Sequence, residues 1–313
     1  MRNEFIRQLL ELAREDERIM LVTGDLGFAV LDEYQRELPK QFLNVGVAEQ
    51  NMTGVGVGLA LSGKIVFTYS IGNFTTLRCL EQIRNGACYH GANVNAVAVG
   101  GGFSYGPLGF SHHATEDLAI LRALPEMTVL SPGDRWETAA ATRALVERPG
   151  PGYLRLDKMP AEATHGPDDV FEVGKARMIR DGEAMTLVAT GGVLGEAIGA
   201  ATKLAEEGID CRVLSVHSLA PFDADAIAKA AKETGGIITI EEHMTHGGLA
   251  GAVSEACMDA GVMPRQWRRL GLPGRFATEV GSQPYLRARY GLDAESVADT
   301  VRDLVEPIRK AAT

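Results

Sequence analysis

Short apolar runs rich in β-branched residues alternate with helical patterns along nearly the whole chain of 313 residues. Strands that alternate with helices are typical of βαβ units, in which helices cover a mostly parallel sheet. The alternation breaks around residues 158–183, where proline, glycine and charged residues are mixed, and then resumes. We therefore predict an α/β protein of two domains, residues 1–165 and 184–313, joined by a linker at 166–183 with an edge hairpin.

The same pattern predicts where the individual elements lie. Apolar, β-branched runs are expected to form strands at 19–24, 64–70, 94–100, 127–132, 152–157, 184–191, 210–218 and 235–243. Helical periodicity is expected to form helices at 48–61, 73–89, 117–124, 135–147, 194–208, 223–233, 249–261 and 294–311. Each predicted domain therefore contains its own mostly parallel sheet flanked by helices.

Composition argues against several classes of function. The chain is 45% hydrophobic and 23% charged, which is enough apolar material for packed cores. Its net charge is −10 and it contains no Lys/Arg run, which argues against a nucleic-acid or membrane-surface role. The cysteines lack CxxC or CxxH spacing, which disfavours a disulfide framework or a zinc site. The chain starts with a charged amphipathic pattern, and no apolar run approaches the roughly 18 residues of a membrane span. We expect a soluble cytoplasmic protein.

Gly54, Gly56 and Gly58 superficially resemble a dinucleotide-binding fingerprint. That fingerprint should follow a strand directly and open a helix, whereas these glycines lie inside the helical stretch that begins at Ala48. Glycine in a helix interior costs up to about 1 kcal/mol, so a packing reason is the better explanation. We expect this helix to lie close to a sheet or to a partner helix.

His112 and His113 form the one adjacent histidine pair and follow a glycine-rich segment, "GGGFSYGPLGF". Imidazoles beside such a loop suit proton transfer or hydrogen bonding to a polar substrate. The alternative is that one of them caps the helix expected to start near Glu116. In "EEHMTHGG", residues 241–248, the two acids continue a strand and should face opposite sides, which makes a metal site improbable.

Two other charged residues have alternative interpretations. Arg155, in "YLRLD", could form a salt bridge to Asp157 on the same strand face, or could bind an anion at the end of the strand. Glu49, in "NVGVAEQN", could be a first-turn acid stabilised by the helix dipole. That explanation leaves its apolar neighbours unaccounted for, since they would bury a carboxylate with no basic residue near it in the sequence. The loop "TGDLG" at 23–27 is interpreted as a turn rather than a ligand-binding loop.

Taken together, these segments resemble the thiamine-diphosphate enzymes of the transketolase family, specifically their second half. The resemblance is carried by "FLNVGVAEQNMTGVGVGLALSGKIVF", "EQIRNGACY", "SHHATEDLAILRALPEMTVLSPGD" and "GPGYLRLD". It continues through "TLVATG", "VHSLAPFD" and "EEH…GGL" in the order of the family's C-terminal domain, and so covers essentially the whole chain.

The resemblance implies roles for individual residues. Glu49 falls on the carboxylate that hydrogen-bonds N1′ of the cofactor's aminopyrimidine ring. Ile71, Phe74 and Leu77 fall around that ring, with aliphatic side chains at two positions where the family has aromatic ones. His112 matches a substrate-facing histidine, and Arg155 matches a phosphate-binding arginine.

Two departures bear on the substrate. The chain has Gly100 where the family usually carries another phosphate-facing histidine, and Leu108-Gly109 where it usually carries Asp-Gly. The resemblance therefore implies transfer of a two-carbon ketol unit from a ketose to an aldehyde, with a phosphorylated or otherwise modified sugar as substrate.

The GDG…Asn motif that holds magnesium diphosphate in this superfamily is missing from the sequence. The resemblance thus implies thiamine diphosphate and Mg²⁺ as cofactors, with the metal ligands on a partner subunit and none on this chain. We expect that partner to carry GDG…Asn and to assemble with this chain as a heterotetramer containing two chains of each kind. Two alternatives stay open: the β subunit of a 2-oxo-acid dehydrogenase, and a non-catalytic scaffold paralogue.

Overall fold

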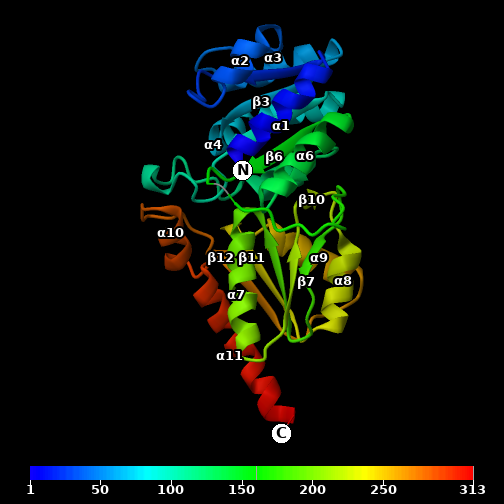
Figure 1. Cartoon of the computed structure of the whole chain (residues 1–313), viewed down its shortest axis with the longest axis vertical. Helices are drawn as coiled ribbons and strands as arrows, with labels where there is room; N and C mark the ends of the chain where they lie inside the picture. The colour runs from blue at the N-terminus through cyan, green and yellow to red at the C-terminus, as the bar shows by residue number, and fades with distance from the viewer. Residues whose placement is uncertain (160, 313) are drawn as a thin grey trace.

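The computed structural model of the chain describes residues 1–159 and 161–312. They form two sheets, each in its own domain, and the domains follow one another along the long axis of the molecule (Figure 1). The upper sheet has seven strands in the order β10-β5-β6-β4-β3-β1-β2, all parallel except β10, which is antiparallel to β5. Its strands are β1 (Ile19–Thr23), β2 (Phe42–Asn44), β3 (Ile65–Ile71), β4 (Val94–Val99), β5 (Thr128–Leu130), β6 (Gly152–Leu156) and β10 (Ser218–Ala220).

Helices cover both faces of the upper sheet because its buried strands have two apolar faces. On β1, Ile19 and Leu21 pack in the cluster that contains α1 and α6, whereas Met20 and Val22 pack in the cluster that contains α3. This alternation follows the two-residue period of a strand. The helices are α1 (Arg2–Glu15), α2 (Asp32–Glu37), α3 (Glu49–Leu61), α4 (Gly72–Thr75), α5 (Asp117–Arg122) and α6 (Arg135–Glu147).

The lower sheet has the order β12-β11-β8-β9-β7, with only β7 antiparallel to its neighbour. Helices α7 and α11 pack together on one side, and α8 and α9 pack together on the other. The strands are β7 (Arg177–Arg180), β8 (Met185–Thr190), β9 (Cys211–Ser215), β11 (Ile237–Met244) and β12 (Trp267–Leu272). The helices are α7 (Leu194–Glu206), α8 (Ala224–Glu233), α9 (Leu249–Asp259), α10 (Gln283–Arg289) and α11 (Ala294–Ala312).

The predicted fold class is confirmed, with local corrections. The linker contains no hairpin among its described residues, because β7 pairs with β9 instead of with a sequence neighbour. The strand expected at 210–218 ends at Ser215, and the next strand, β10, joins the sheet of the other domain. The helix expected at 73–89 is broken into α4, a 3₁₀ turn at Leu77–Cys79 and a π-helix at Gln82–Cys88.

Short or half-exposed elements escaped the sequence pattern. β2 is three residues long and largely exposed, and β12 carries exposed Arg268 and Arg269 in its middle, so neither shows a continuous apolar run. Within the described part of the chain, no helix is both long enough and apolar enough to cross a membrane.

Candidate active site

The predicted site residues gather at one edge of the upper sheet, where the parallel strands β1 to β4 end. Ligands of open α/β sheets bind at this carboxyl edge. Glu49 opens α3 shortly after β2, Phe74 lies on α4 directly after β3, and His112 lies in the loop after β4. The strand order therefore brings together residues that are more than 60 positions apart in the sequence.

Glu49 is buried, with 4% of its surface exposed, and it has a basic partner that sequence reasoning missed. Nη1 of Arg78 donates a hydrogen bond to Oε2 of Glu49 at 2.7 Å. Gly24, at the end of β1, packs against the carboxylate stem, since a Cβ there would lie 3.5 Å from Cγ of Glu49. No pattern in the sequence marked Arg78, because the broken helix at 72–88 is what turns it towards α3.

Phe74 connects the acid to the histidine. Cζ of Arg78 lies 4.5 Å from the centroid of the Phe74 ring, and the ring of His112 meets Phe74 edge-on at 5.2 Å between centroids. Ile71 ends β3 and is half-buried, while Leu77 is exposed on the following turn. The segment after β3 therefore offers one aromatic face beside the buried carboxylate, flanked by aliphatic side chains.

The two histidines of the pair lie in different environments. His112 is half-exposed, and its Nδ1 lies 3.0 Å from Oγ of Ser111. His113 is buried: its Nε2 lies 3.1 Å from the carbonyl oxygen of Gly106, and burial lowers the pKa of its imidazole. The capping alternative was wrong for both, because α5 begins after Glu116 with no side-chain cap. His112 is the member of the pair that lies beside Phe74.

Arg155 is buried and donates hydrogen bonds inside the protein from Nε and Nη2. Its Nε donates to Oδ2 of Asp117 at 2.9 Å, and its Nη2 donates to the carbonyl oxygens of Ala114 and Glu242, each at 2.9 Å. The salt bridge to Asp157, one of the two alternatives, is not the one that forms: Arg155 pairs with Asp117, and the Asp157 carboxylate accepts from Gln283 and Arg287. Arg155 is 2% exposed, and its contacts with Asp117 and Glu242 join the two domains. Its substrate-binding role stays a prediction.

Glu242, on β11 of the lower domain, holds the loop that carries the histidines. Its Oε1 accepts the backbone N–H of Phe103, and its Oε2 accepts from Nε of Arg287 at 2.6 Å. Nε2 of Gln283 donates to the same carboxylate at 2.9 Å. A few residues on, Met244 N–H donates to the carbonyl oxygen of Thr115 at 2.8 Å. The segment 242–244 therefore fixes both ends of the histidine loop.

The neighbouring acid, Glu241, points the other way, as expected from alternation along a strand. Its carboxylate accepts the N–H groups of Leu249 and Ala250 at the start of α9, at 2.7 and 2.9 Å. The described residues contain no group of three or more His, Cys, Asp or Glu side chains that could hold a metal ion.

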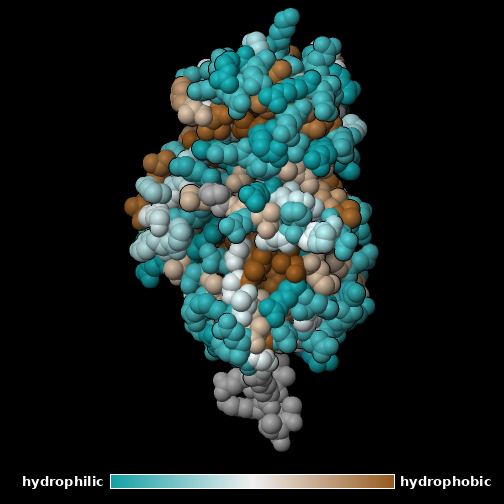
Figure 2. Space-filling view, viewed as in Figure 1, coloured by the Kyte–Doolittle hydropathy of each residue, from teal (hydrophilic) through white to brown (hydrophobic). Residues whose placement is uncertain are grey.

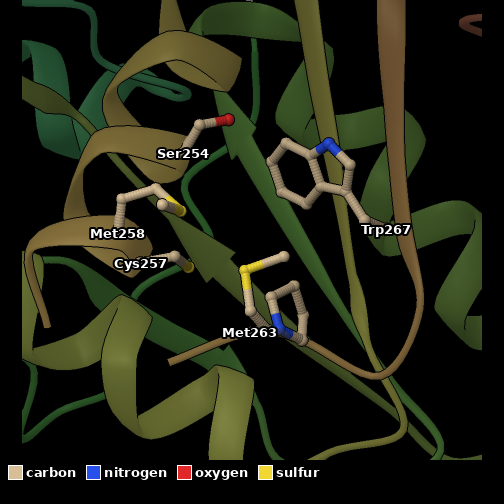
Figure 3. A pocket seen from close by; sticks show the side chains of 6 residues that line it. Ser254, Cys257, Met258, Met263 and Trp267 are labelled. Carbon is tan, nitrogen blue, oxygen red and sulfur yellow. The ribbon is translucent and has the colours of Figure 1, made fainter. Parts of the chain in front are cut away.

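A separate hollow of about 240 Å³ lies between α9 and β12 in the lower domain (Figure 3). It is lined by Ser254, Cys257, Met258, Met263, Pro264 and Trp267. The one ionisable side chain in this lining is the thiol of Cys257, and burial raises its pKa, so the hollow offers apolar and sulfur surface with no carboxylate or imidazole.

Comparison with known proteins identifies the family. Residues 1–162 match the pyrimidine-binding domain of transketolase, and residues 174–297 match the transketolase C-terminal domain. The chain belongs to the transketolase family. Its two domains correspond to the second half of a transketolase, in agreement with the resemblance found in the sequence.

Several members of the transketolase family resemble the chain over nearly its full length. It is 39% identical over 307 residues to one subunit of the apulose-4-phosphate transketolase of Phocaeicola vulgatus, covering 97% of each chain. It is 36% identical over 307 residues to a subunit of the 6-deoxy-6-sulfo-D-fructose transketolase of a Clostridium species, covering 98% of this chain and 94% of the relative. A solved structure described as a split-gene transketolase in an inactive beta4 tetramer superposes with a TM-score of 0.86 at 34% identity, covering 97% of each chain.

Proposed function

We propose that this chain is one subunit of a split transketolase, which transfers a two-carbon ketol unit from a ketose to an aldehyde by means of thiamine diphosphate. The observation that carries the proposal is the guanidinium of Arg78, which links buried Glu49 to the aromatic ring of Phe74, with His112 meeting the same ring edge-on. In this family such a constellation would bind the pyrimidine half of the cofactor.

The residues present fit that half of thiamine diphosphate. A flat group with N–H donors already contacts both Glu49 and Phe74 in the free chain, namely the guanidinium of Arg78. An aminopyrimidine ring is likewise flat and presents N–H donors at its edge, so the carboxylate and the phenyl face suit it. When bound, thiamine diphosphate supplies the electron sink for cleavage of the ketose.

Each side chain then has a definite task. Glu49 accepts a hydrogen bond from the protonated edge of the ring and holds a proton there. Phe74 sets the plane of the ring, and Ile71 and Leu77 flank it. His112, half-exposed beside Phe74, hydrogen-bonds the sugar and moves a proton to or from its hydroxyl groups.

We propose that the rest of the site belongs to a partner subunit with the GDG…Asn motif, which binds the diphosphate and Mg²⁺. Exposed apolar side chains follow each of the strands β1 to β4 at the site edge: Phe28, Val47, Leu77, Leu108 and Phe110. Figure 2 shows apolar side chains at the left margin of the molecule, at the level of the loop after β4 in Figure 1. A chain that covered this edge would remove them from water.

Helix α3 supports the same assembly. A Cβ on Gly56 would lie 3.2 Å from Cγ2 of Thr68 and 3.3 Å from Cγ1 of Val66, so this glycine allows α3 to approach β3. A Cβ on Gly54 or Gly58 would meet nothing within 4 Å, and packing within the described chain does not require either glycine. We propose that the face with these two glycines contacts the partner subunit in a heterotetramer with two chains of each kind.

The substrate that we propose is a ketose with an anionic substituent. The names of the two relatives cite a phosphorylated and a sulfonated sugar, which share a terminal anion. The changes at Gly100 and Leu108-Gly109 favour such a modified sugar over an ordinary pentose phosphate.

Titration calorimetry with thiamine diphosphate and Mg²⁺ tests the split site. The isolated chain is expected to bind weakly and without dependence on Mg²⁺, whereas the chain co-expressed with a GDG-bearing partner should bind tightly with Mg²⁺. Tight Mg²⁺-dependent binding by the isolated chain would refute the split. Turnover of a 2-oxo acid with a lipoyl acceptor would favour the dehydrogenase alternative, and cofactor binding without any turnover would favour the scaffold.

A further inference from the structure

The side chain of Arg78 occupies the space that a ring bound to Glu49 and Phe74 would need. Its Nη1 lies 2.7 Å from Oε2 of Glu49, and its Cζ lies 4.5 Å from the centroid of the Phe74 ring. These are the two contacts, one at the edge and one on the face, by which a flat N–H donor is held. A second flat group cannot make these same contacts, with Oε2 of Glu49 and with this face of Phe74, while the guanidinium stays in place.

We propose that Arg78 is a gate in the pyrimidine site, which closes over Glu49 in the free chain and swings out when thiamine diphosphate binds. The inference rests on the proposed function, because it takes Glu49 and Phe74 as the ring site. It adds a residue that competes with the cofactor instead of binding it.

The position of Arg78 allows this movement. Its side chain is 46% exposed, and solvent can therefore receive the guanidinium once it leaves Phe74. Its backbone is held separately, since Nε2 of Gln50 donates to the carbonyl oxygen of Arg78 at 3.1 Å. The side chain can thus rotate away without unfolding the turn at Leu77–Cys79.

A second arginine–aromatic contact provides a comparison with an arginine that is held in place by several ion pairs. Cζ of Arg177 lies 5.0 Å from the ring centroid of Trp136, in a geometry close to that of Arg78 on Phe74. The side chain of Arg177, however, is only 4% exposed, and it pairs with Asp134, Glu137 and Asp169. Among the residues that the structure describes, Arg177 pairs with three carboxylates, whereas Arg78 pairs with one and its side chain is open to water.

The gate also has a role when the cofactor is absent. A buried carboxylate without a partner is costly, and Arg78 compensates Glu49 until the ring replaces it. The apparent affinity for thiamine diphosphate is then lowered by the fraction of molecules in which Arg78 is closed.

Affinity of the assembled enzyme for thiamine diphosphate tests the gate. Arg78→Gln, in the chain co-expressed with its GDG-bearing partner, should bind thiamine diphosphate with Mg²⁺ about three- to tenfold more tightly than wild type, because a half-buried ion pair and a half-buried cation–π contact no longer compete. Arg84→Gln is the matched control: this exposed arginine on the same segment hydrogen-bonds Asn85, and its loss should leave the affinity unchanged. Thermal unfolding checks that both variants fold.

A crystal structure of the loaded wild-type assembly provides a readout that does not depend on turnover, and it should show the guanidinium away from Phe74. Unchanged or weaker binding by Arg78→Gln, or a guanidinium still on Phe74 beside the bound ring, would overturn the gate while leaving the proposed function intact. A wild-type assembly that binds no thiamine diphosphate would overturn the proposed function and the gate with it.

Discussion

Glu49 and Glu242 are buried to nearly the same extent, at 4% and 3% exposure, and each pairs with an arginine, yet their surroundings differ. The partner of Glu49, Arg78, is 46% exposed, whereas the partner of Glu242, Arg287, is 12% exposed. Glu242 also accepts from Gln283 and from the backbone N–H of Phe103. The two buried carboxylates are therefore distinguished by the exposure of their arginine partners and not by their own burial.

The two carboxylates act on the same site from different domains. Glu49 belongs to the upper domain and faces the proposed ring site directly. Glu242 belongs to the lower domain and reaches the site through the backbone of the histidine loop at Phe103. We therefore expect substitutions at Glu49 to damage the chemistry and spare the fold, and substitutions at Glu242 to lower the stability of the fold first.

The largest effect should come from Glu49→Gln in the assembled enzyme. An amide is a poor proton acceptor, so the ring would lose its acid–base partner, and we expect ketol transfer to fall by at least about a hundredfold. The free energy of unfolding should change by less than about 1 kcal/mol, because the amide oxygen still accepts from the half-exposed Arg78. Initial rates and denaturant unfolding of the same variant measure both quantities. Retained activity would remove Glu49 from the mechanism.

Glu242→Ala should instead lower the stability of the fold. Its removal leaves Arg287 with Asp157 and Glu196 as its ion-pair partners in the described part of the chain, and the Phe103 N–H without its acceptor. Leaving the buried N–H of Phe103 without an acceptor costs about 1–3 kcal/mol, and the lost ion pair with Arg287 adds to that cost, which urea unfolding would detect. Glu242→Gln keeps an acceptor oxygen and should lose less. A loss below about 1 kcal/mol for the alanine variant would erase the distinction between the two carboxylates.

The contrast between these sites also explains what the sequence could predict. Continuous apolar strands and amphipathic helices predicted both sheets, and motif resemblance placed Glu49, Phe74 and His112, which the fold brings to one edge. The sequence did not predict Arg78 as a site residue, because its position depends on a helix that breaks into an α-helical, a 3₁₀ and a π-helical segment. Glu242 escaped because its role depends on contact between domains, and no periodicity within one segment reports such a contact.

A smaller effect is expected where the histidine loop meets Glu242. Gly102 has a φ of +57°, and a Cβ there would lie 2.6 Å from Cγ of Glu242. Gly91 is a matched control, with a φ of +59° and nothing within 4 Å of the added atom. Gly91→Ala should cost about 1–2 kcal/mol of stability from backbone strain alone. Gly102→Ala should cost more and should also raise KM for the sugar, since the loop would shift His112. If Gly102→Ala and Gly91→Ala lowered the stability equally, the side chain of Glu242 would not be in close contact with the loop at Gly102.

The smallest effect concerns the buried histidine of the same loop. Burial lowers the pKa of His113 below its usual value of about 6.5, while the unfolded chain keeps that value. The unfolded state therefore binds more protons than the folded state below about pH 6.5, and stability should fall as the pH drops through that value. At pH 5.5 the contribution of one such group is at most about 1.4 kcal/mol relative to pH 7.5. His113→Asn should reduce the difference in unfolding free energy between these two pH values by up to that amount. An unchanged difference would mean that the loop tolerates a charged imidazole, and that its attachment to the lower domain is looser than the contacts of Glu242 and Met244 indicate.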